Sequence, residues 1–266
     1  MKLDVLRSCC PPSPGRRKTS SGNLGLIEIG ASAGLNLRID HVHCTYDIGG
    51  ALFERGPDTS PVRLMSAADT SAGSMPLEAI ASISIGTRRG LDINPLDVKD
   101  DSQMRWLQAL VWPDQPERFE RLRDAIDLAR RMPVLITRGD AVDDLREVVD
   151  AVPEGEHPTV VTAWTLAYLP EERRREFVAN LDTIGTERDL SWISMEHPSF
   201  CAGLPVAAEA ASTLSHDRHP VSVHRYRNGV ASRVWVATTH PHGRTFAWHP
   251  PDALAVTDTP DPGFAR

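Results

Sequence analysis

Short strand-like segments recur seven times along the chain, and longer stretches with helical periodicity separate most of them. The seven segments span residues 24–29, 88–95, 133–137, 159–164, 190–196, 220–227 and 232–239. Segments of this length, bounded by turn-forming residues, predict β-strands. The last two are joined by Asn228-Gly229, a dipeptide that favours a two-residue hairpin turn.

Helical periodicity fills the longer stretches. Apolar positions recur at three- and four-residue steps over residues 100–131, with a break at Trp112-Pro113. Further helices are predicted over residues 141–152 and 170–181, and a helix start over 35–40. This alternation predicts an α/β fold: a Rossmann-like three-layer sandwich with a mostly parallel, seven-stranded sheet and a C-terminal antiparallel hairpin.

The remaining segments suggest how the domain is bounded. Residues 1–22 combine turn formers and like charges with little to bury, which predicts a disordered tail. Residues 23–250 are predicted to form one Rossmann-like domain, and residues 251–266 a C-terminal tail. Residues 43–88 have a less regular pattern and are interpreted as an inserted flap with short strands.

Composition narrows the classes of function. The chain has 266 residues and a net charge of −7 that is mixed along its length, so we expect neither nucleic-acid nor membrane binding. The four cysteines fit neither a disulfide framework nor a zinc spacing, and no signal peptide is evident. We therefore expect a cytoplasmic protein without a metal. The oligomeric state stays open.

Four predicted strands end in residues that suit a ligand site. Small residues in Gly30-Ala31-Ser32-Ala33-Gly34 let a ligand approach the backbone, although a tight turn explains them equally well. Asp92 can accept hydrogen bonds from ribose hydroxyls or cap a turn, and Asp140 can face an adenine or cap a helix. The segment from Trp164 to Pro170 can line a pocket or belong to the core. Ligands of open α/β sheets bind at these carboxyl ends.

The order of these segments resembles the class I methyltransferases that use S-adenosylmethionine. Residues 28–34 look like the first motif of that family, with Ser32 in place of its middle glycine, and the resemblance extends over about residues 24–200. It implies S-adenosylmethionine as cofactor and in-line methyl transfer to an unknown small-molecule acceptor. The residues that it implies for cofactor binding are Glu28, Gly30, Ala31, Ser32, Gly34, Asp92, Ile93, Asp140, Ala141 and Trp164. No catalytic base is evident.

The chain also looks like an uncharacterised bacterial family, a domain of unknown function. The shared segments are residues 28–37, Trp106-Leu107 with Val111-Trp112-Pro113, and Pro241-His242-Gly243. That family has no settled reaction, so this resemblance supports the fold and leaves the activity open.

Two other classes of function stay open. Gly30-Ala31-Ser32-Ala33-Gly34 also has the pattern of a serine-hydrolase nucleophile elbow, with Ser32 as nucleophile and a later histidine such as His197, His240 or His242 as base. Alternatively, the chain is a binding protein that kept a methyltransferase-like fold without catalysis. Glu196, which follows the fifth strand, can orient a substrate amine or cap the strand end.

Overall fold

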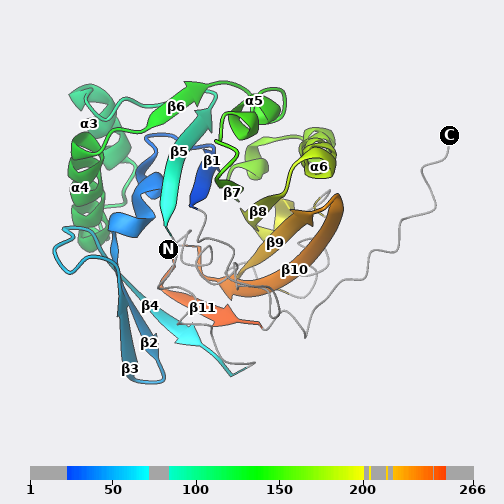
Figure 1. Cartoon of the computed structure of the whole chain (residues 1–266). Helices are drawn as coiled ribbons and strands as arrows, with labels where there is room; N and C mark the ends of the chain where they lie inside the picture. Colours follow the sequence, from blue (N-terminus) through cyan, green and yellow to red (C-terminus); the bar gives the residue numbers. More distant parts are fainter. Residues whose placement is uncertain are drawn as a thin grey trace.

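The computed structural model describes residues 23–71, 84–200, 204, 214, 218–241 and 243–249, and Figure 1 shows how their elements are arranged. The predicted tails at residues 1–22 and 251–266 lie outside these ranges, as does His242. Within them, no helix is long and apolar enough to span a bilayer.

The described residues form one sheet of eleven strands in the order β3-β2-β4-β11-β10-β9-β8-β7-β1-β5-β6. The strands are β1 (Leu24–Ile29), β2 (His43–Ile48), β3 (Ala51–Arg55), β4 (Arg63–Asp69), β5 (Ile85–Asp92), β6 (Leu135–Arg138), β7 (His157–Ala163), β8 (Leu190–Met195), β9 (His219–Arg227), β10 (Val230–Thr239) and β11 (Thr245–Trp248). The helices are α3 (Asp101–Ala109), α4 (Pro116–Arg131), α5 (Leu145–Asp150) and α6 (Glu171–Glu187), with 3₁₀ turns η1 (Leu35–His41), η2 (Leu166–Tyr168) and η3 (Pro198–Phe200).

The centre of the sheet has a doubly wound topology. Strands β6, β5, β1, β7 and β8 are neighbours in that order and all run parallel. The direction in which the chain adds strands therefore reverses between β1 and β7. The prediction of an α/β fold with a mostly parallel sheet is confirmed. The predicted C-terminal hairpin is present as β9 and β10, and its turn residues Asn228 and Gly229 both have positive φ.

The predicted strand number was wrong, because the sheet contains β2, β3, β4 and β11 in addition to the seven expected strands. The first three come from the segment interpreted as a flap. Strands β3 and β4 expose most of their outward positions, and β11 is only four residues long. β2 and β3 pair as a hairpin inside that segment, whereas the pairing of β4 with the distant β11 leaves no local signal in the sequence.

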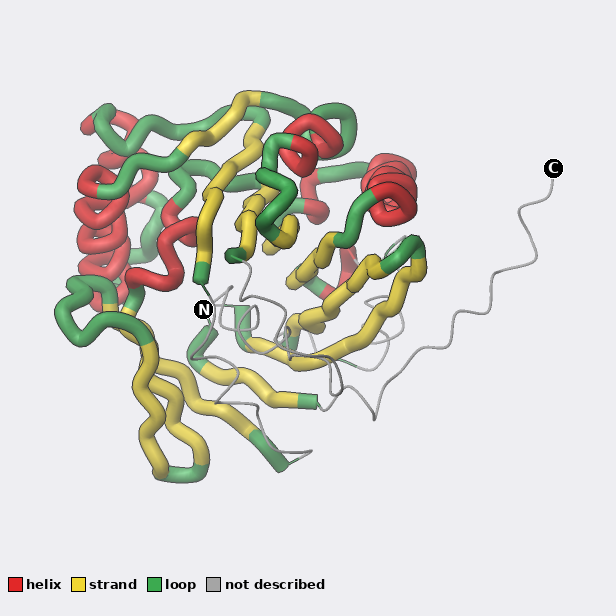
Figure 2. The backbone as a smooth tube through the Cα atoms, viewed as in Figure 1, coloured by secondary structure: helices red, strands yellow, loops and turns green. Residues whose placement is uncertain are grey.

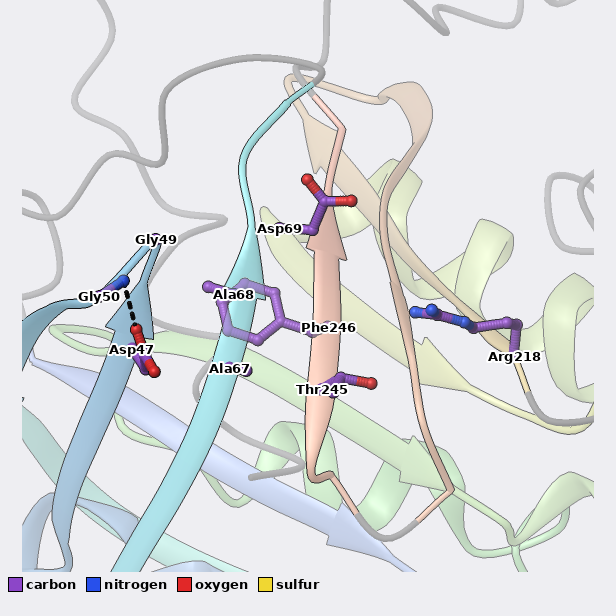
Figure 3. A pocket seen from close by; sticks show the side chains of 9 residues that line it. All are labelled: Asp47, Gly49, Gly50, Ala67, Ala68, Asp69, Arg218, Thr245 and Phe246. Carbon is purple, nitrogen blue, oxygen red and sulfur yellow. Dashed lines mark hydrogen bonds between the residues drawn. The ribbon is translucent and has the colours of Figure 1, made fainter.

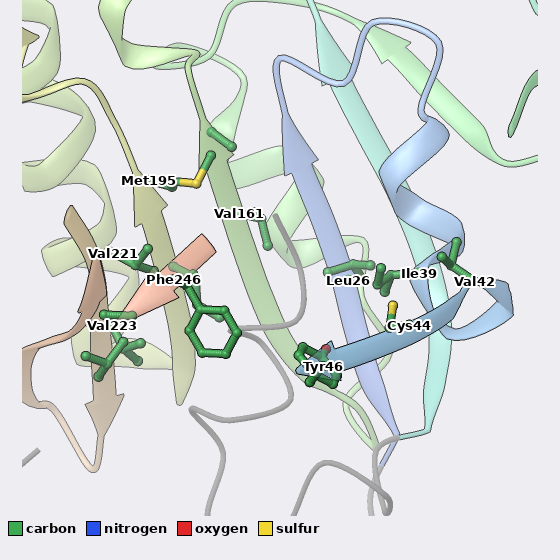
Figure 4. Close-up of a cluster of buried hydrophobic side chains, with 14 of the residues drawn as sticks. Leu26, Ile39, Val42, Cys44, Tyr46, Val161, Met195, Val221, Val223 and Phe246 are labelled. Atoms are coloured by element: carbon green, nitrogen blue, oxygen red, sulfur yellow. The ribbon is translucent and has the colours of Figure 1, made fainter. Parts of the chain in front are cut away.

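The additional strands fold back over the central ones and share a hydrophobic core with them. Tyr46 of β2 and Phe246 of β11 meet edge to face, with ring centroids 6.0 Å apart, and face Leu26 of β1 (Figure 4). Val161 and Met195, on β7 and β8, belong to the same cluster. Strands, together with η1 and the end of α4, thus cover the face of the sheet that a helical layer covers in a three-layer sandwich. Figure 2 shows the folded-back half as strands and loops.

Helices cover the opposite face and the β5–β6 end of the sheet. On the opposite face, Val149 of α5 and Phe177 of α6 pack against Ile27 and Trp192. At the other end, the buried Arg38 of η1 donates hydrogen bonds to the carbonyl oxygens of Gly34, Ala129 and Met132, at 2.6, 3.3 and 2.7 Å. Arg38 therefore joins the end of α4 to the turn that follows β1.

His224 predicts how stability depends on pH. Burial, assisted by the charge of Arg233, lowers the pKa of this imidazole to about 3, and the ring packs 4.2 Å from that of Trp192. Because the pKa is lower in the folded state, the unfolded chain binds more protons below pH 6.5. The contribution of His224 to the free energy of unfolding is fully present above that pH. As the pH falls towards 3, this contribution decreases by up to about 1.4 kcal/mol per pH unit.

His224→Phe should remove this part of the acid dependence while keeping a planar ring on Trp192. Urea unfolding of both proteins from pH 7 to pH 4.5 measures it, since the wild-type free energy of unfolding should fall more steeply. His157, whose pKa burial lowers to about 4, titrates in both proteins and serves as an internal control. Equal slopes in the two proteins would contradict the interpretation.

Candidate functional site

The carboxyl ends of the five parallel strands define the candidate site. Strands β1 and β7 are neighbours. Within the parallel part of the sheet, β5 and β6 lie beyond β1, whereas β8 lies beyond β7 on the other side. Doubly wound sheets bind ligands in the crevice that this reversal creates. The segments that surround it are the turn after β1, Asp92 at the end of β5, Trp164 and Thr165 after β7, and Glu196 after β8.

The turn after β1 is held in an unusual backbone conformation. Gly30, Ser32 and Gly34 have φ angles of 71°, 52° and 65°, in the left-handed region. A Cβ on Gly30 would lie 2.3 Å from the Thr165 hydroxyl oxygen, which itself donates a hydrogen bond of 2.8 Å to the Ile29 carbonyl. Glycine is therefore required at position 30, whereas Ser32 adopts a conformation that costs free energy for a residue with a side chain.

The backbone donors of this turn bind to the protein itself. The N–H groups of Gly30 and Ala31 donate to the Leu91 carbonyl at 2.8 and 3.3 Å, and that of Gly34 donates to Ala31 at 2.7 Å. The Ser32 N–H donates to Asp92 Oδ2 at 2.7 Å. The turn thus ties β1 to β5. It does not resemble a phosphate-binding loop, whose N–H groups point at the ligand.

Asp92 lies directly beside the turn. Its other oxygen, Oδ1, accepts from the Asn94 N–H at 2.7 Å, and the carboxylate is partly exposed. Each carboxylate oxygen can accept a second hydrogen bond. The next residue, Ile93, is exposed at the surface and offers an apolar contact at the same edge.

Two buried carboxylates lie near the ends of β1 and β8, the strands on either side of β7. Glu28 of β1 accepts a hydrogen bond of 2.5 Å from the Asn36 side chain. Glu196 has no exposed surface, and its Oε1 accepts from the N–H groups of Thr165 and Leu166 at 3.4 and 3.3 Å. Glu196 therefore caps the start of the turn η2, rather than the end of its own strand.

Aromatic rings gather next to Glu196. Trp164 has a φ of 62°, an outlier for so large a residue, and its N–H donates to the Met195 carbonyl. Its ring centroid lies 4.5 Å from that of His219 and 5.8 Å from that of His197. Backbone strain of this kind concentrates at functional sites, which makes this cluster part of the candidate site.

Asp140 lies apart from these groups, in the turn before α5. Its Oδ1 accepts from the N–H groups of Val142 and Asp143 and pairs with Arg173 at 2.8 Å. Although partial burial opposes the shift, these hydrogen bonds and the Arg173 charge hold the pKa of Asp140 below its usual value. Asp140 caps the turn before α5, with Ala141 beside it. β6 is also separated from β1 by β5.

A family model described as an uncharacterized protein conserved in bacteria (DUF2332) matches residues 16–248, which include every site residue named above. The chain belongs to this family. Membership of DUF2332 confirms the predicted resemblance to an uncharacterised bacterial family, whereas the resemblance to methyltransferases stays a prediction. No curated protein matches the chain, and neither does any solved structure.

The structure of this DUF2332 member brings most of the predicted residues together and adds others. Glu28, the turn at 30–34, Asp92 and Trp164 surround the reversal between β1 and β7. Sequence reasoning included Thr165 in the segment that can line the pocket, but no spacing linked it to Gly30. It missed His219, because its place beside Trp164 depends on the pairing of β9 with β8.

The contact between Gly30 and Thr165 yields a testable coupling. Gly30→Ala should lower the free energy of unfolding by about 2–5 kcal/mol, combining the left-handed backbone with overpacking. In a Thr165→Ala background the same change should cost only about 1–2 kcal/mol, because the hydroxyl clash is gone. Denaturant unfolding of the four proteins measures the coupling, and strictly additive costs would contradict this packing.

Proposed function

We propose that this protein is an S-adenosylmethionine-dependent methyltransferase that acts on a small-molecule acceptor. The observation that carries the proposal is the hydrogen bond between Asp92 and the Ser32 N–H. It joins the acidic strand end and the small-residue turn into one wall, at the strand reversal where nucleotide-like ligands bind in this fold class. The resemblance assigns the ribose hydroxyls to Asp92 and the methionine portion to the turn.

The charge of the site favours this cofactor over a dinucleotide. Glu28, Asp92 and Glu196 place carboxylates at the ends of three strands, and the turn has already used the N–H groups of Gly30, Ala31, Ser32 and Gly34. Phosphates would be repelled there, whereas a sulfonium ion and an ammonium group would be attracted. The residues present therefore fit the cofactor.

Under this proposal the protein acts mainly by positioning. The bound cofactor supplies an activated methyl group. Asp92 would hold the ribose, Ile93 would contact the adenine, and the Trp164 ring would bound the path by which the acceptor approaches. Holding the acceptor nucleophile in line with the methyl group converts an encounter between two molecules into a step within one complex.

Calorimetric titration with S-adenosylmethionine and S-adenosylhomocysteine tests the proposal. Wild type should bind both. Asp92→Ala should weaken binding at least about tenfold, since hydrogen bonds to a charged group contribute about 1.5–3 kcal/mol. A well-folded wild type that binds neither compound would contradict the proposed function.

Asp100→Ala provides a matched control. Asp100 accepts hydrogen bonds from the N–H groups of Ser102 and Gln103, so its loss should destabilise the protein about as much as the loss of Asp92. It caps α3, and its side chain bonds to residues of that helix rather than to the turn at 30–34, so its substitution should leave cofactor affinity unchanged. Equal weakening by both variants would indicate a general loss of structure.

A serine hydrolase is the second candidate, favoured by one observation. Ser32 follows a strand and has the left-handed backbone that a nucleophile elbow requires. Within the described ranges, however, no histidine forms a hydrogen bond with the Ser32 hydroxyl, and His197 Nδ1 accepts from the Ser199 N–H at 3.1 Å.

Ser32→Ala separates the two candidates. For a methyltransferase, cofactor affinity should change less than about threefold, because the Ser32 N–H that binds Asp92 is retained. For a hydrolase, labelling by a fluorophosphonate probe should occur in wild type and disappear in the variant. Such labelling, without cofactor binding by wild type, would replace the first proposal by the second.

A further inference from the structure

A pocket of about 330 Å³ opens among the folded-back strands, on elements other than those of the strand reversal. Figure 3 shows β2, β4 and β11 along it, with Arg218 extending towards β11 from the side opposite Asp47. Small-molecule sites have volumes of about 300–1,000 Å³, so this pocket suits a small ligand.

The pocket forms because a small residue lies between larger ones on three adjacent strands. Asp47, Ala67 and Thr245 are neighbours across β2, β4 and β11, and Ala67 is the middle one. Beyond Asp47, the turn Gly49-Gly50 has no side chains, and a Cβ at either glycine would meet no atom within 4 Å. Larger residues at these positions would fill the space.

Two carboxylates line the pocket, and each uses one oxygen to hold a turn. Asp47 Oδ1 accepts from the Gly50 N–H at 2.8 Å, and Asp69 Oδ1 accepts from the Ser71 N–H at 2.9 Å. The hydrogen bonds from Ser71 and, less strongly, the charge of Arg218 lower the pKa of Asp69. In the part of the chain that the structure describes, the second oxygen of Asp47 accepts no hydrogen bond, whereas Asp69 also accepts one from the Ser71 side chain.

Arg218 supplies the opposite charge. Among the described residues, its guanidinium forms neither a hydrogen bond nor an ion pair, and it lies more than 4 Å from both carboxylates. A guanidinium with unused donors binds a carboxylate in a bidentate manner. The pocket therefore presents one cation and two anions, and Arg218 attracts Asp69 without forming an ion pair with it.

We propose that this pocket binds a small amino acid with a second cationic group, of which lysine is the simplest probe. The ligand carboxylate pairs with Arg218, and its two ammonium groups pair with Asp69 and Asp47. This arrangement neutralises the excess negative charge of the pocket. A phosphate-bearing ligand would meet two carboxylates for one guanidinium, which disfavours it.

Titration of the full chain with three compounds tests the charge pattern. Lysine has all three groups, norleucine lacks the second amine, and cadaverine lacks the carboxylate. Saturable lysine binding, at least about tenfold tighter than that of either analogue, is the expected result, since each lost pair removes about 1.4 kcal/mol or more. Absence of saturable lysine binding at millimolar concentrations would overturn the proposal, as would equal affinity for lysine and cadaverine.

Two variants and a control locate the binding. Arg218→Met should weaken lysine and norleucine about tenfold and leave cadaverine unchanged, whereas Asp69→Asn should weaken lysine and cadaverine. Arg63→Met, on the exposed face of the same strand β4 and outside the pocket lining, should change none of these affinities. Lysine binding that survives both pocket variants would overturn the assignment.

The pocket proposal does not rest on the methyltransferase proposal. S-adenosylmethionine affinity should be unchanged in Arg218→Met, and lysine affinity should be unchanged in Asp92→Ala. Either proposal can therefore fail alone.

Discussion

The apolar face of β7, β8 and β9 has to be removed from water, and this constraint shapes the whole protein. In a three-layer sandwich a helix would cover it. Here Tyr46, Phe246 and Trp248, on β2 and β11, contribute the covering side chains. Burial of large aromatic side chains supplies much of the stability of such a core. The eleven strands, the curled sheet and the pocket on the folded-back strands all follow from this way of covering the face.

The elements that the sequence predicted well are those with a local signal. The strands β1, β8, β9 and β10, the helices α4 and α6 and the hairpin turn at Asn228-Gly229 each carry their own periodicity or turn chemistry. The strands β4 and β11 carry little, because they pair with each other although they lie far apart in the chain. β11 lies between β10 and β4, and nothing within its four residues indicates either neighbour.

The same distinction applies to the candidate site. The turn at 30–34 and Asp92 were identified from small residues and an acid at strand ends, and the structure joins them by a hydrogen bond. The contacts of Thr165 with Gly30 and of His219 with Trp164 were not predicted, because they exist only after β1, β7, β8 and β9 have paired. For Asp140, the sequence allowed an adenine contact or a helix cap, and the structure shows the hydrogen bonds of a cap.

The position of β11 also has a consequence for the order of folding. β4 is synthesised early, yet one of its two neighbours in the sheet is β11, which lies near the end of the described chain. Until β11 has left the ribosome, that edge of β4 and the core around Phe246 stay uncovered. Contacts of such large sequence separation slow folding and expose strand edges meanwhile. That edge of β4 is therefore open to pairing with other chains until synthesis is complete.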